Sequence, residues 1–222
     1  DLLSPETLFH GMMPFLHDSP PSPRLAVKPG TISMRVASEL SDIRPVILGA
    51  VVRGLELDED IIKRLMDHQE KLHFALGRGR KRASIGVHDL STLAPPFRVE
   101  AVERSHSFIP LAMDEDMTID EILEKHPKGV DYAHLLDGMD KVPIIFDSND
   151  AVLSFPPIIN GDHTTVTENT RDIFIDVTGL DLRACEAALM LICLQLSVLG
   201  GQVESVRVTT CEGKDWSING TP

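Results

Sequence analysis

The sequence holds few cysteines and few aromatic residues. Of its 222 residues, three are cysteines, one is tryptophan and one is tyrosine. The cysteines are odd in number and lack the spacing of zinc ligands, which indicates free thiols, so we expect a reducing, cytoplasmic setting. Cys185 and Cys193 lie in a helical pattern of apolar residues, where a thiol usually serves as a small core residue.

Long apolar runs and positive charge are also scarce. No run reaches the ~20 apolar residues of a membrane span, so we expect no membrane partner. No basic region precedes an apolar core at the start, and because the chain opens with Asp1 rather than Met, we expect a fragment excised from a longer chain. The formal charge of −13 argues against a general nucleic-acid binder, which needs a basic surface to release counterions.

Familiar catalytic signatures are missing as well. The sequence contains no GxGxxG, P-loop, GxSxG or HExxH motif, and no heptads or internal repeat. No set of His or Cys residues has the spacing of metal ligands, so we expect no metal site. The composition, with 42% hydrophobic and 25% charged residues, is typical of an ordinary globular domain.

The sequence does contain patterns of both helices and short strands. Apolar periodicity and capping residues predict helices over 58–76, 118–126 and 181–199. Short β-rich runs predict strands at 83–87, 142–146, 152–155, 173–178 and 203–209. Strands around 142–178 are expected to pair as hairpins. The predicted fold class is therefore α+β or mixed α/β, with mostly antiparallel short strands and flanking helices.

The chain is expected to have three parts. Residues 1–30 read as a helical remnant of a preceding module followed by a proline-rich linker. Residues 31–212 form the main domain, and residues 213–222 an irregular tail. The main domain is long enough to bury a core of its own.

The stretch 152–179 predicts a pocket. Pro156-Pro157 ends its first strand, because proline fixes φ and gives the sheet no donor. In its second strand the side chains alternate, which places Asp176 and Thr178 on one face and predicts one wall of a polar-floored pocket. His88, at the end of the strand 83–87, is a further candidate for that pocket. Taken singly, each of these residues is also compatible with a purely structural role.

Several ordered segments resemble a known family, the editing domain of the phenylalanyl-tRNA synthetase β subunit of archaeal and eukaryotic type. The likeness extends from about Ile43 to Val208. It is carried by GRGRKRASIGVHDL, ILEKHPKGVDYAHLL, VPIIFDSN, LSFPPIINGDHT, TENTR and FIDVTG. The resemblance implies a heterotetramer in which the α subunit charges tRNA with phenylalanine. The domain resembled here would hydrolyse the ester of mischarged tyrosyl-tRNA(Phe). Editing would need no cofactor, whereas ATP and Mg would serve a synthetic site that this fragment lacks.

The resemblance also implies site residues. Asp176 would accept the tyrosine hydroxyl, and Ser154 would bond the substrate or the attacking water. A covalent role for Ser154 is the sharper alternative, although no histidine nearby in sequence would activate it. The remaining substrate contacts, which would line the pocket or offer backbone groups to the amino acid, are His88, Ile145, Pro156, Pro157, Asn160, Gly161 and Thr178.

A basic cluster offers a contact for the incoming tRNA, although a solvated turn is the plainer interpretation of such a run. Its members are Arg78, Arg80, Lys81 and Arg82. Relatives often carry an arginine near the position of Thr165, which puts an arginine contact from that loop in doubt. A non-catalytic module that binds tRNA or the partner subunit is therefore the main alternative, and a sensor of free amino acids is a third.

Overall fold

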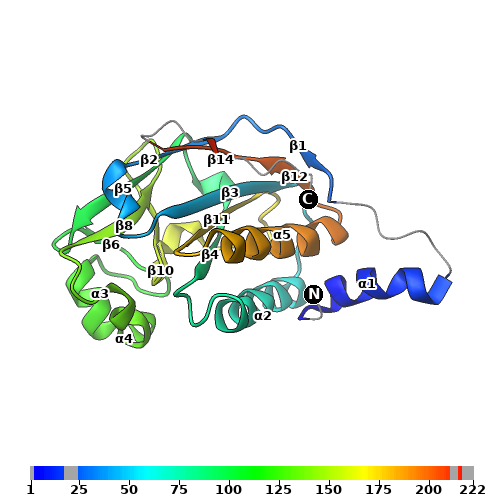
Figure 1. The fold of residues 1–222 in the computed structure, drawn as a ribbon, viewed down its shortest axis with the longest axis horizontal. Helices are drawn as coiled ribbons and strands as arrows, with labels where there is room; N and C mark the ends of the chain where they lie inside the picture. Colours follow the sequence, from blue (N-terminus) through cyan, green and yellow to red (C-terminus); the bar gives the residue numbers. More distant parts are fainter. Residues whose placement is uncertain (1–2, 18–24, 211–214, 217–222) are drawn as a thin grey trace.

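Two stacked β-sheets with helices on their outer sides make up the body of the molecule (Figure 1). The computed structural model describes residues 3–17, 25–210 and 215–216. The helices and the mostly antiparallel strand pairs confirm the predicted mixed α+β fold class. The α-helices are α1 Pro5–His17, α2 Glu59–Ala75, α3 Ile119–Lys125, α4 Pro127–Tyr132 and α5 Leu182–Val198.

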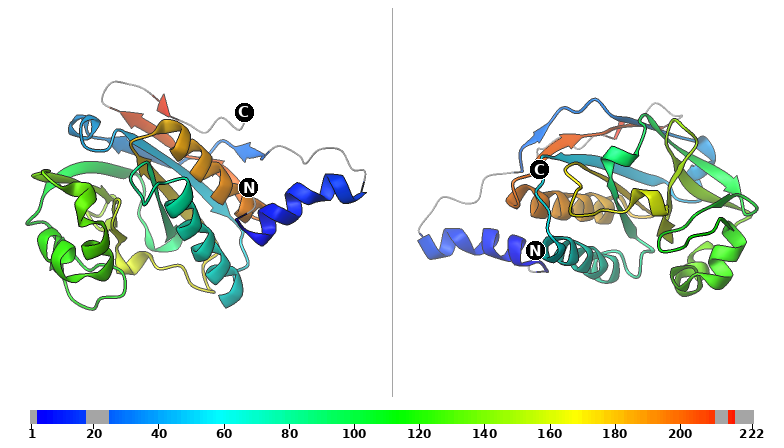
Figure 2. Two further views of the ribbon diagram at one scale, coloured as in Figure 1. Left: turned by 60° about the horizontal axis from the view of Figure 1, so that its bottom comes forward. Right: turned by 180° about the vertical axis from the view of Figure 1, so that it is seen from behind.

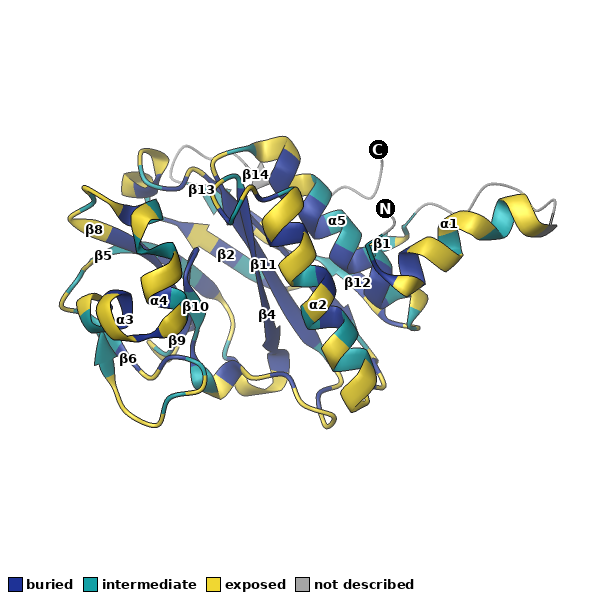
Figure 3. Ribbon diagram, turned by 90° about the horizontal axis from the view of Figure 1, so that it is seen from below, coloured by how far each residue is buried: buried dark blue, intermediate teal, exposed yellow. Residues whose placement is uncertain are grey.

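The first sheet has the strand order β1-β12-β3-β11-β4, with β11 antiparallel to both of its neighbours. Helices α2 and α5 cover one face of this sheet, and their apolar side chains form a core with β3, β4 and β11 (Figure 3). Cys185 and Cys193 are buried in this core, as predicted, whereas Cys211 lies outside the described residues. The strands are β1 Val27–Lys28, β3 Val46–Arg53, β4 Ala83–Asp89, β11 Ile173–Gly179 and β12 Gln202–Ser205.

The second sheet has the order β10-β9-β8-β5-β2-β13-β14, and a further core fills the space between the two sheets. In that core the rings of Phe97 and Phe174 lie 4.4 Å apart. Helices α3 and α4 cover the outer side of β8 and β9. The strands are β2 Ser33–Val36, β5 Phe97–Glu103, β8 Lys141–Phe146, β9 Val152–Phe155, β10 Ile159–Asn160, β13 Arg207–Thr210 and β14 Asp215–Trp216. The short pair β6 Ser107–Phe108 and β7 Met117–Thr118 stands apart from both sheets.

Two predictions about strand pairing were wrong. β8 and β9 do pair antiparallel, but β11 leaves this group and pairs with β3 and β4 in the other sheet. The predicted strand 203–209 is divided into β12 and β13, which belong to different sheets. Val206 lies at the break and is fully buried between the sheets. Alternation along a strand gives the face of each side chain but not the neighbouring strand, and this is why both errors arose.

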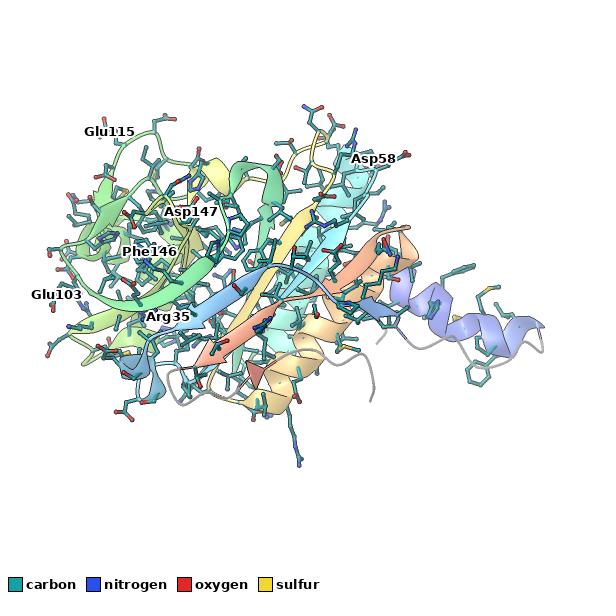
Figure 4. All side chains as sticks on the ribbon, turned by 90° about the horizontal axis from the view of Figure 1, so that it is seen from above. Arg35, Asp58, Glu103, Glu115, Phe146 and Asp147 are labelled. Carbon is teal, nitrogen blue, oxygen red and sulfur yellow. The ribbon has the colours of Figure 1, made fainter. Side chains whose placement is uncertain are left out.

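Capping residues begin the helices where the sequence predicts them. Asp58, labelled in Figure 4, accepts a hydrogen bond from the backbone N–H of Ile61 at 2.7 Å and starts α2. Asp181 does the same for α5. Thr118 and Glu121 form a reciprocal capping box at α3. Such caps satisfy backbone N–H groups that have no partner inside the helix.

Helix α1 projects from the body but is attached to it through polar contacts (Figure 2). The carboxylate of Glu6 accepts from Arg64 of α2 at 2.8 Å and from Gln195 of α5 at 3.1 Å. Its apolar residues Phe9 and Phe15 are exposed. The division of the chain at residues 30 and 212 stays a prediction; part of the linker and most of the tail lie outside the described residues. None of the helices in the described part has the length and apolar character of a membrane span.

Candidate functional site

A cavity of about 370 Å³ lies between α2, the strands β4 and β11, and the segment 154–160. Apolar walls come from α2 and from Pro156 and Pro157, which are joined by a cis peptide bond. Polar groups converge from the other elements and include Ser154, Asn160 and Asp176. A mainly apolar hollow with a few polar groups is the usual form of a small-molecule site.

Asp176 is 1% exposed and lines the cavity from the middle of β11. Its neighbours across the sheet are both glycines, Gly49 on β3 and Gly86 on β4. A Cβ at position 86 would lie 1.9 Å from Oδ2 of Asp176, whereas a Cβ at position 49 would meet its neighbours at ordinary contact distances. The space that the carboxylate occupies therefore exists because residue 86 has no side chain.

His88 holds one oxygen of this carboxylate. Its Nε2 lies 2.7 Å from Oδ2 of Asp176, and its Nδ1 lies 2.9 Å from Oγ1 of Thr164. The ring is completely buried and lies behind Asp176, so it does not line the cavity. Among the described residues, Oδ1 of Asp176 has no hydrogen-bond partner. One oxygen is thus fixed by the protein, and the other has no partner among the described residues.

Ser154 and Asn160 form a second polar pair in the cavity. The Ser154 hydroxyl donates to Oδ1 of Asn160 at 3.3 Å, and the Asn160 amide donates to the carbonyl of Val87 at 3.4 Å. No imidazole contacts Ser154 in the described part of the chain, so nothing there would draw off its proton. This geometry favours a role in binding over a nucleophilic role.

Three more predicted contacts lie away from the cavity surface. Ile145 packs in the core between the sheets. Thr178 does not line the cavity and accepts a hydrogen bond from Arg44 at 2.7 Å. The N–H of Gly161 already donates to the carbonyl of Leu153 at 2.8 Å, so it is not free to bind a substrate or an oxyanion.

The basic cluster is divided by its environment. Arg80 is buried; it donates to the carbonyls of Pro157 and Ile158, pairs with Glu70 at 2.7 Å, and stacks 4.3 Å from the ring centre of Tyr132. It therefore fixes the cavity wall. Of the others, Arg82 pairs with Asp181, whereas Arg78 and Lys81 are exposed and form no ion pair with the described residues.

Sequence reasoning missed two buried polar residues that shape this region, Arg44 and His73. Arg44 lies just before β3. Its guanidinium donates to the carbonyls of Arg80 and Thr178 and to the hydroxyls of Ser84 and Thr178. Burial lowers the pKa of Arg44 to about 10, so it stays charged at neutral pH. An isolated arginine before a proline gives no sequence signal for such a role.

His73 lines the cavity from α2 in its neutral form. Its Nε2 accepts the backbone N–H of Ile85 at 2.8 Å, which requires an unprotonated nitrogen. Burial lowers the pKa of His73 below its usual value, although the nearby carboxylate of Glu70 opposes this. Burial also lowers the pKa values of His68 and His163.

These shifts predict the pH dependence of stability. Each histidine binds a proton near pH 6.5 when unfolded but only at lower pH when folded, so stability is lost as the pH falls below about 6.5. The free energy of unfolding should fall by at most about 1.4 kcal/mol per pH unit for each of the buried histidines His68 and His73, and by less for His163, which is exposed. Urea denaturation between pH 7.5 and 5 measures this slope, and the His73→Gln variant should show a shallower one. An equal slope in the variant would contradict the assignment to His73.

The chain matches a known protein family. The family model described as the B3/4 domain matches residues 45–189. Because this match covers well over half of the 222 residues, the chain belongs to the B3/4 domain family.

Within the described residues, no group of three or more His, Cys, Asp or Glu is placed to hold a metal ion.

The relatives specify the kind of protein in which this domain occurs. The phenylalanine–tRNA ligase beta subunit of Methanosarcina acetivorans is 50% identical over 97% of this chain, which covers 39% of that subunit. The same subunit of Archaeoglobus fulgidus is 49% identical over 82% of this chain and 33% of its own length. The crystal structure of an N-terminal fragment of the phenylalanyl-tRNA synthetase beta-subunit from Pyrococcus horikoshii has a TM-score of 0.85 and 40% identity, covering 88% of this chain and 56% of that one.

The resemblance predicted from the sequence is thus confirmed: the chain corresponds to the B3/4 region of archaeal phenylalanyl-tRNA synthetase beta subunits. It spans between one third and two fifths of the length of the curated relatives named above.

Proposed function

We propose that this domain edits mischarged tRNA by hydrolysing the ester of tyrosyl-tRNA(Phe). The observation that carries the proposal is the buried carboxylate of Asp176, which lines a cavity and has one oxygen without a partner. A phenol hydroxyl is a donor for that oxygen. Phenylalanine would leave the oxygen buried and unpaired, at a cost of roughly 1–3 kcal/mol.

The need for a second site follows from the chemistry of the two amino acids. Phenylalanine and tyrosine differ by one hydroxyl, and an apolar pocket rejects an added hydroxyl only about a hundredfold. A site that offers the hydroxyl an acceptor selects in the opposite sense. Pro156 and Pro157 supply apolar walls for the ring, and Ser154 and Asn160 supply polar contacts for the rest of the aminoacyl group.

We propose a positioned water as the nucleophile. An activated ester needs little more than placement of water and substrate, and a 2′ or 3′ hydroxyl of the terminal ribose is available to assist. The N–H of Gly161 is engaged with the carbonyl of Leu153, so we do not assign it to the developing oxyanion. We assign no other backbone donor to that role. Editing by this route uses no cofactor, whereas ATP and Mg belong to the synthetic site of the whole enzyme.

The tRNA and the α subunit are the proposed partners. Arg78 and Lys81 lie exposed in the same turn as Arg80, which reaches the cavity wall, and so offer charge to a phosphate near the entrance. Thr165 lines the cavity and carries no charge, so no cation from that position takes part. The cytoplasm is the proposed location.

The direct test is deacylation by the β subunit assembled with its α subunit. Wild-type enzyme should hydrolyse Tyr-tRNA(Phe) faster than Phe-tRNA(Phe). In Asp176→Asn, which keeps the size but removes the charge, the ratio of the two rates should fall about tenfold, because a hydrogen bond to a charged group contributes roughly 1.5–3 kcal/mol. An unchanged ratio would sink the role of Asp176.

A non-catalytic binding module is the second candidate, favoured because no base among the described residues contacts the hydroxyl of Ser154. It predicts that the assembled enzyme binds tRNA(Phe) normally but releases no tyrosine. A sensor of free amino acids would instead be stabilised by tyrosine without any tRNA. Thermal unfolding with and without millimolar tyrosine, together with the deacylation assay, distinguishes the editing enzyme, the binding module and the sensor.

A further inference from the structure

We propose that Thr164 and His88 are positioning residues that set the preference for tyrosine by orienting the carboxylate of Asp176. This inference rests on the proposed editing function and concerns how the same site discriminates between its substrates. The three residues come from separate parts of the chain: Thr164 from the turn Asp162–Thr164, His88 from β4, and Asp176 from β11.

The three side chains form one buried row. Thr164 and Asp176 are each 1% exposed, and His88 is 0% exposed. The His88 ring is also stacked on Phe174, with ring centres 5.8 Å apart and planes 29° from parallel. The two hydrogen bonds that join the three side chains make the row rigid, because breaking either of them leaves a polar group unpaired in a medium of low dielectric constant.

The contact between His88 and Asp176 gives the direction of these hydrogen bonds, because two acceptors 2.7 Å apart, Nε2 and Oδ2, need a proton between them. Thr164 has one hydroxyl proton, and its Oγ1 lies 2.9 Å from both Nδ1 of His88 and the carbonyl of Gly161. That carbonyl already accepts the backbone N–H of Thr164 at 3.1 Å. A neutral His88 ring with its proton on Nε2 donates to Asp176 and leaves Nδ1 as an acceptor, so the hydroxyl, which can also reach the carbonyl of Gly161, donates to Nδ1 in this tautomer. A histidine tautomer is set in this way by the partner of its other nitrogen.

The opposite tautomer would disturb the site. An unprotonated Nε2 would direct its lone pair at Oδ2 of Asp176 from 2.7 Å, and the two acceptors would repel each other. The carboxylate would then rotate, and Oδ1 would no longer face the cavity in a fixed direction. Gly86 leaves room for this row because it has no side chain. A Cβ at that position would lie 2.7 Å from Nε2 of His88.

The consequence concerns phenylalanine as much as tyrosine. With Oδ2 held by His88, Oδ1 is presented to the cavity and rejects a ring that has no hydroxyl. A carboxylate free to turn away would tolerate phenylalanine. Loss of the Thr164 hydroxyl should therefore accelerate hydrolysis of the cognate Phe-tRNA(Phe) while it slows hydrolysis of Tyr-tRNA(Phe).

The test uses the complete αβ enzyme with Thr164→Val, which keeps the shape but removes the hydroxyl. The ratio of Tyr-tRNA(Phe) to Phe-tRNA(Phe) deacylation should fall about tenfold, the equivalent of one buried hydrogen bond. Thr164→Ser, which restores a hydroxyl, should recover the ratio to within about twofold. Thr167→Val is the matched control, since Thr167 lies in the same loop but away from the cavity and should leave the ratio unchanged.

A spectroscopic measurement reports on the tautomer independently of activity. The ¹⁵N shifts of His88 should show a proton on Nε2 in the wild type and Thr164→Ser, and a mixture of tautomers in Thr164→Val. An unchanged deacylation ratio in Thr164→Val, or a wild-type proton on Nδ1, would overturn the proposal. Failure of the wild-type enzyme to hydrolyse Tyr-tRNA(Phe) would instead refute the editing function, and the ¹⁵N shifts would still test the orientation of His88.

Discussion

Replacing Gly86 with alanine is expected to remove most of the preference for the tyrosyl ester. The new Cβ would lie 1.9 Å from Oδ2 of Asp176 and 2.7 Å from Nε2 of His88, which is too close for the pair to stay in place. The carboxylate must swing away from β4 and lose its bond to His88. We expect the ratio of Tyr-tRNA(Phe) to Phe-tRNA(Phe) deacylation to fall on the order of 100-fold, the upper end for a charged hydrogen bond.

Gly49→Ala is the matched control for this experiment. Gly49 pairs with Asp176 from the opposite side, on β3, and an added Cβ there would have no neighbour nearer than 3.4 Å. Both variants place alanine in the same sheet beside the same aspartate, so they differ only in the clash. Equal deacylation ratios in the two variants would show that the carboxylate's place does not depend on Gly86.

Among the variants named here, Arg44→Ala is expected to cause the largest fall in the free energy of unfolding. Its guanidinium is buried and bridges the carbonyl of Arg80 to Ser84 and Thr178 at the ends of β4 and β11. The variant would leave acceptors unpaired and a cavity behind, at a cost of about 3 kcal/mol. For a domain of this size that cost lowers the Tm by roughly 6–12 °C, which a thermal melt detects.

Two further variants serve as comparisons for this prediction: Arg44→Lys is the conservative substitution and Arg35→Ala is the surface control. Lysine keeps the charge but cannot reach several acceptors at once with a planar group, so it should recover only part of the loss. Arg35, labelled in Figure 4, lies on β2 and is exposed, so its removal should change the Tm by less than about 2 °C, as is usual for surface substitutions. A similarly small shift in Arg44→Ala would mean that the cost of burying the charge offsets its hydrogen bonds.

The helices could be predicted because their signals are local. Asp58, Thr118 and Asp181 each start a helix by bonding to N–H groups two or three residues ahead, so a short window of sequence contains the cause. The alternation of faces in β11 was predicted for the same reason. Phe174, Asp176 and Thr178 do share one face of β11: Phe174 packs in the core between the sheets, Asp176 lines the cavity and Thr178 bonds to Arg44.

The partners of Asp176 could not be predicted. Asp176 and His88 are 88 residues apart, and His88 and Thr164 are 76 apart. Their contacts depend on β11 lying between β3 and β4, whereas the sequence pattern favoured a hairpin with β9. Arg80 was likewise predicted as a solvated turn or a phosphate contact, because nothing in its neighbourhood reveals that Pro157 and Ile158 bring carbonyl groups to it.

The sequence by itself determined the mixed helix and strand content, the starts of the main helices, the polar face of 173–178 and the family of the domain. The tertiary structure alone decided which strands meet, and therefore which oxygen of Asp176 is held and which is free. The physical reason is range: capping and alternation act over a few residues of chain, whereas a buried hydrogen bond needs two side chains brought together from distant segments by packing of the whole core.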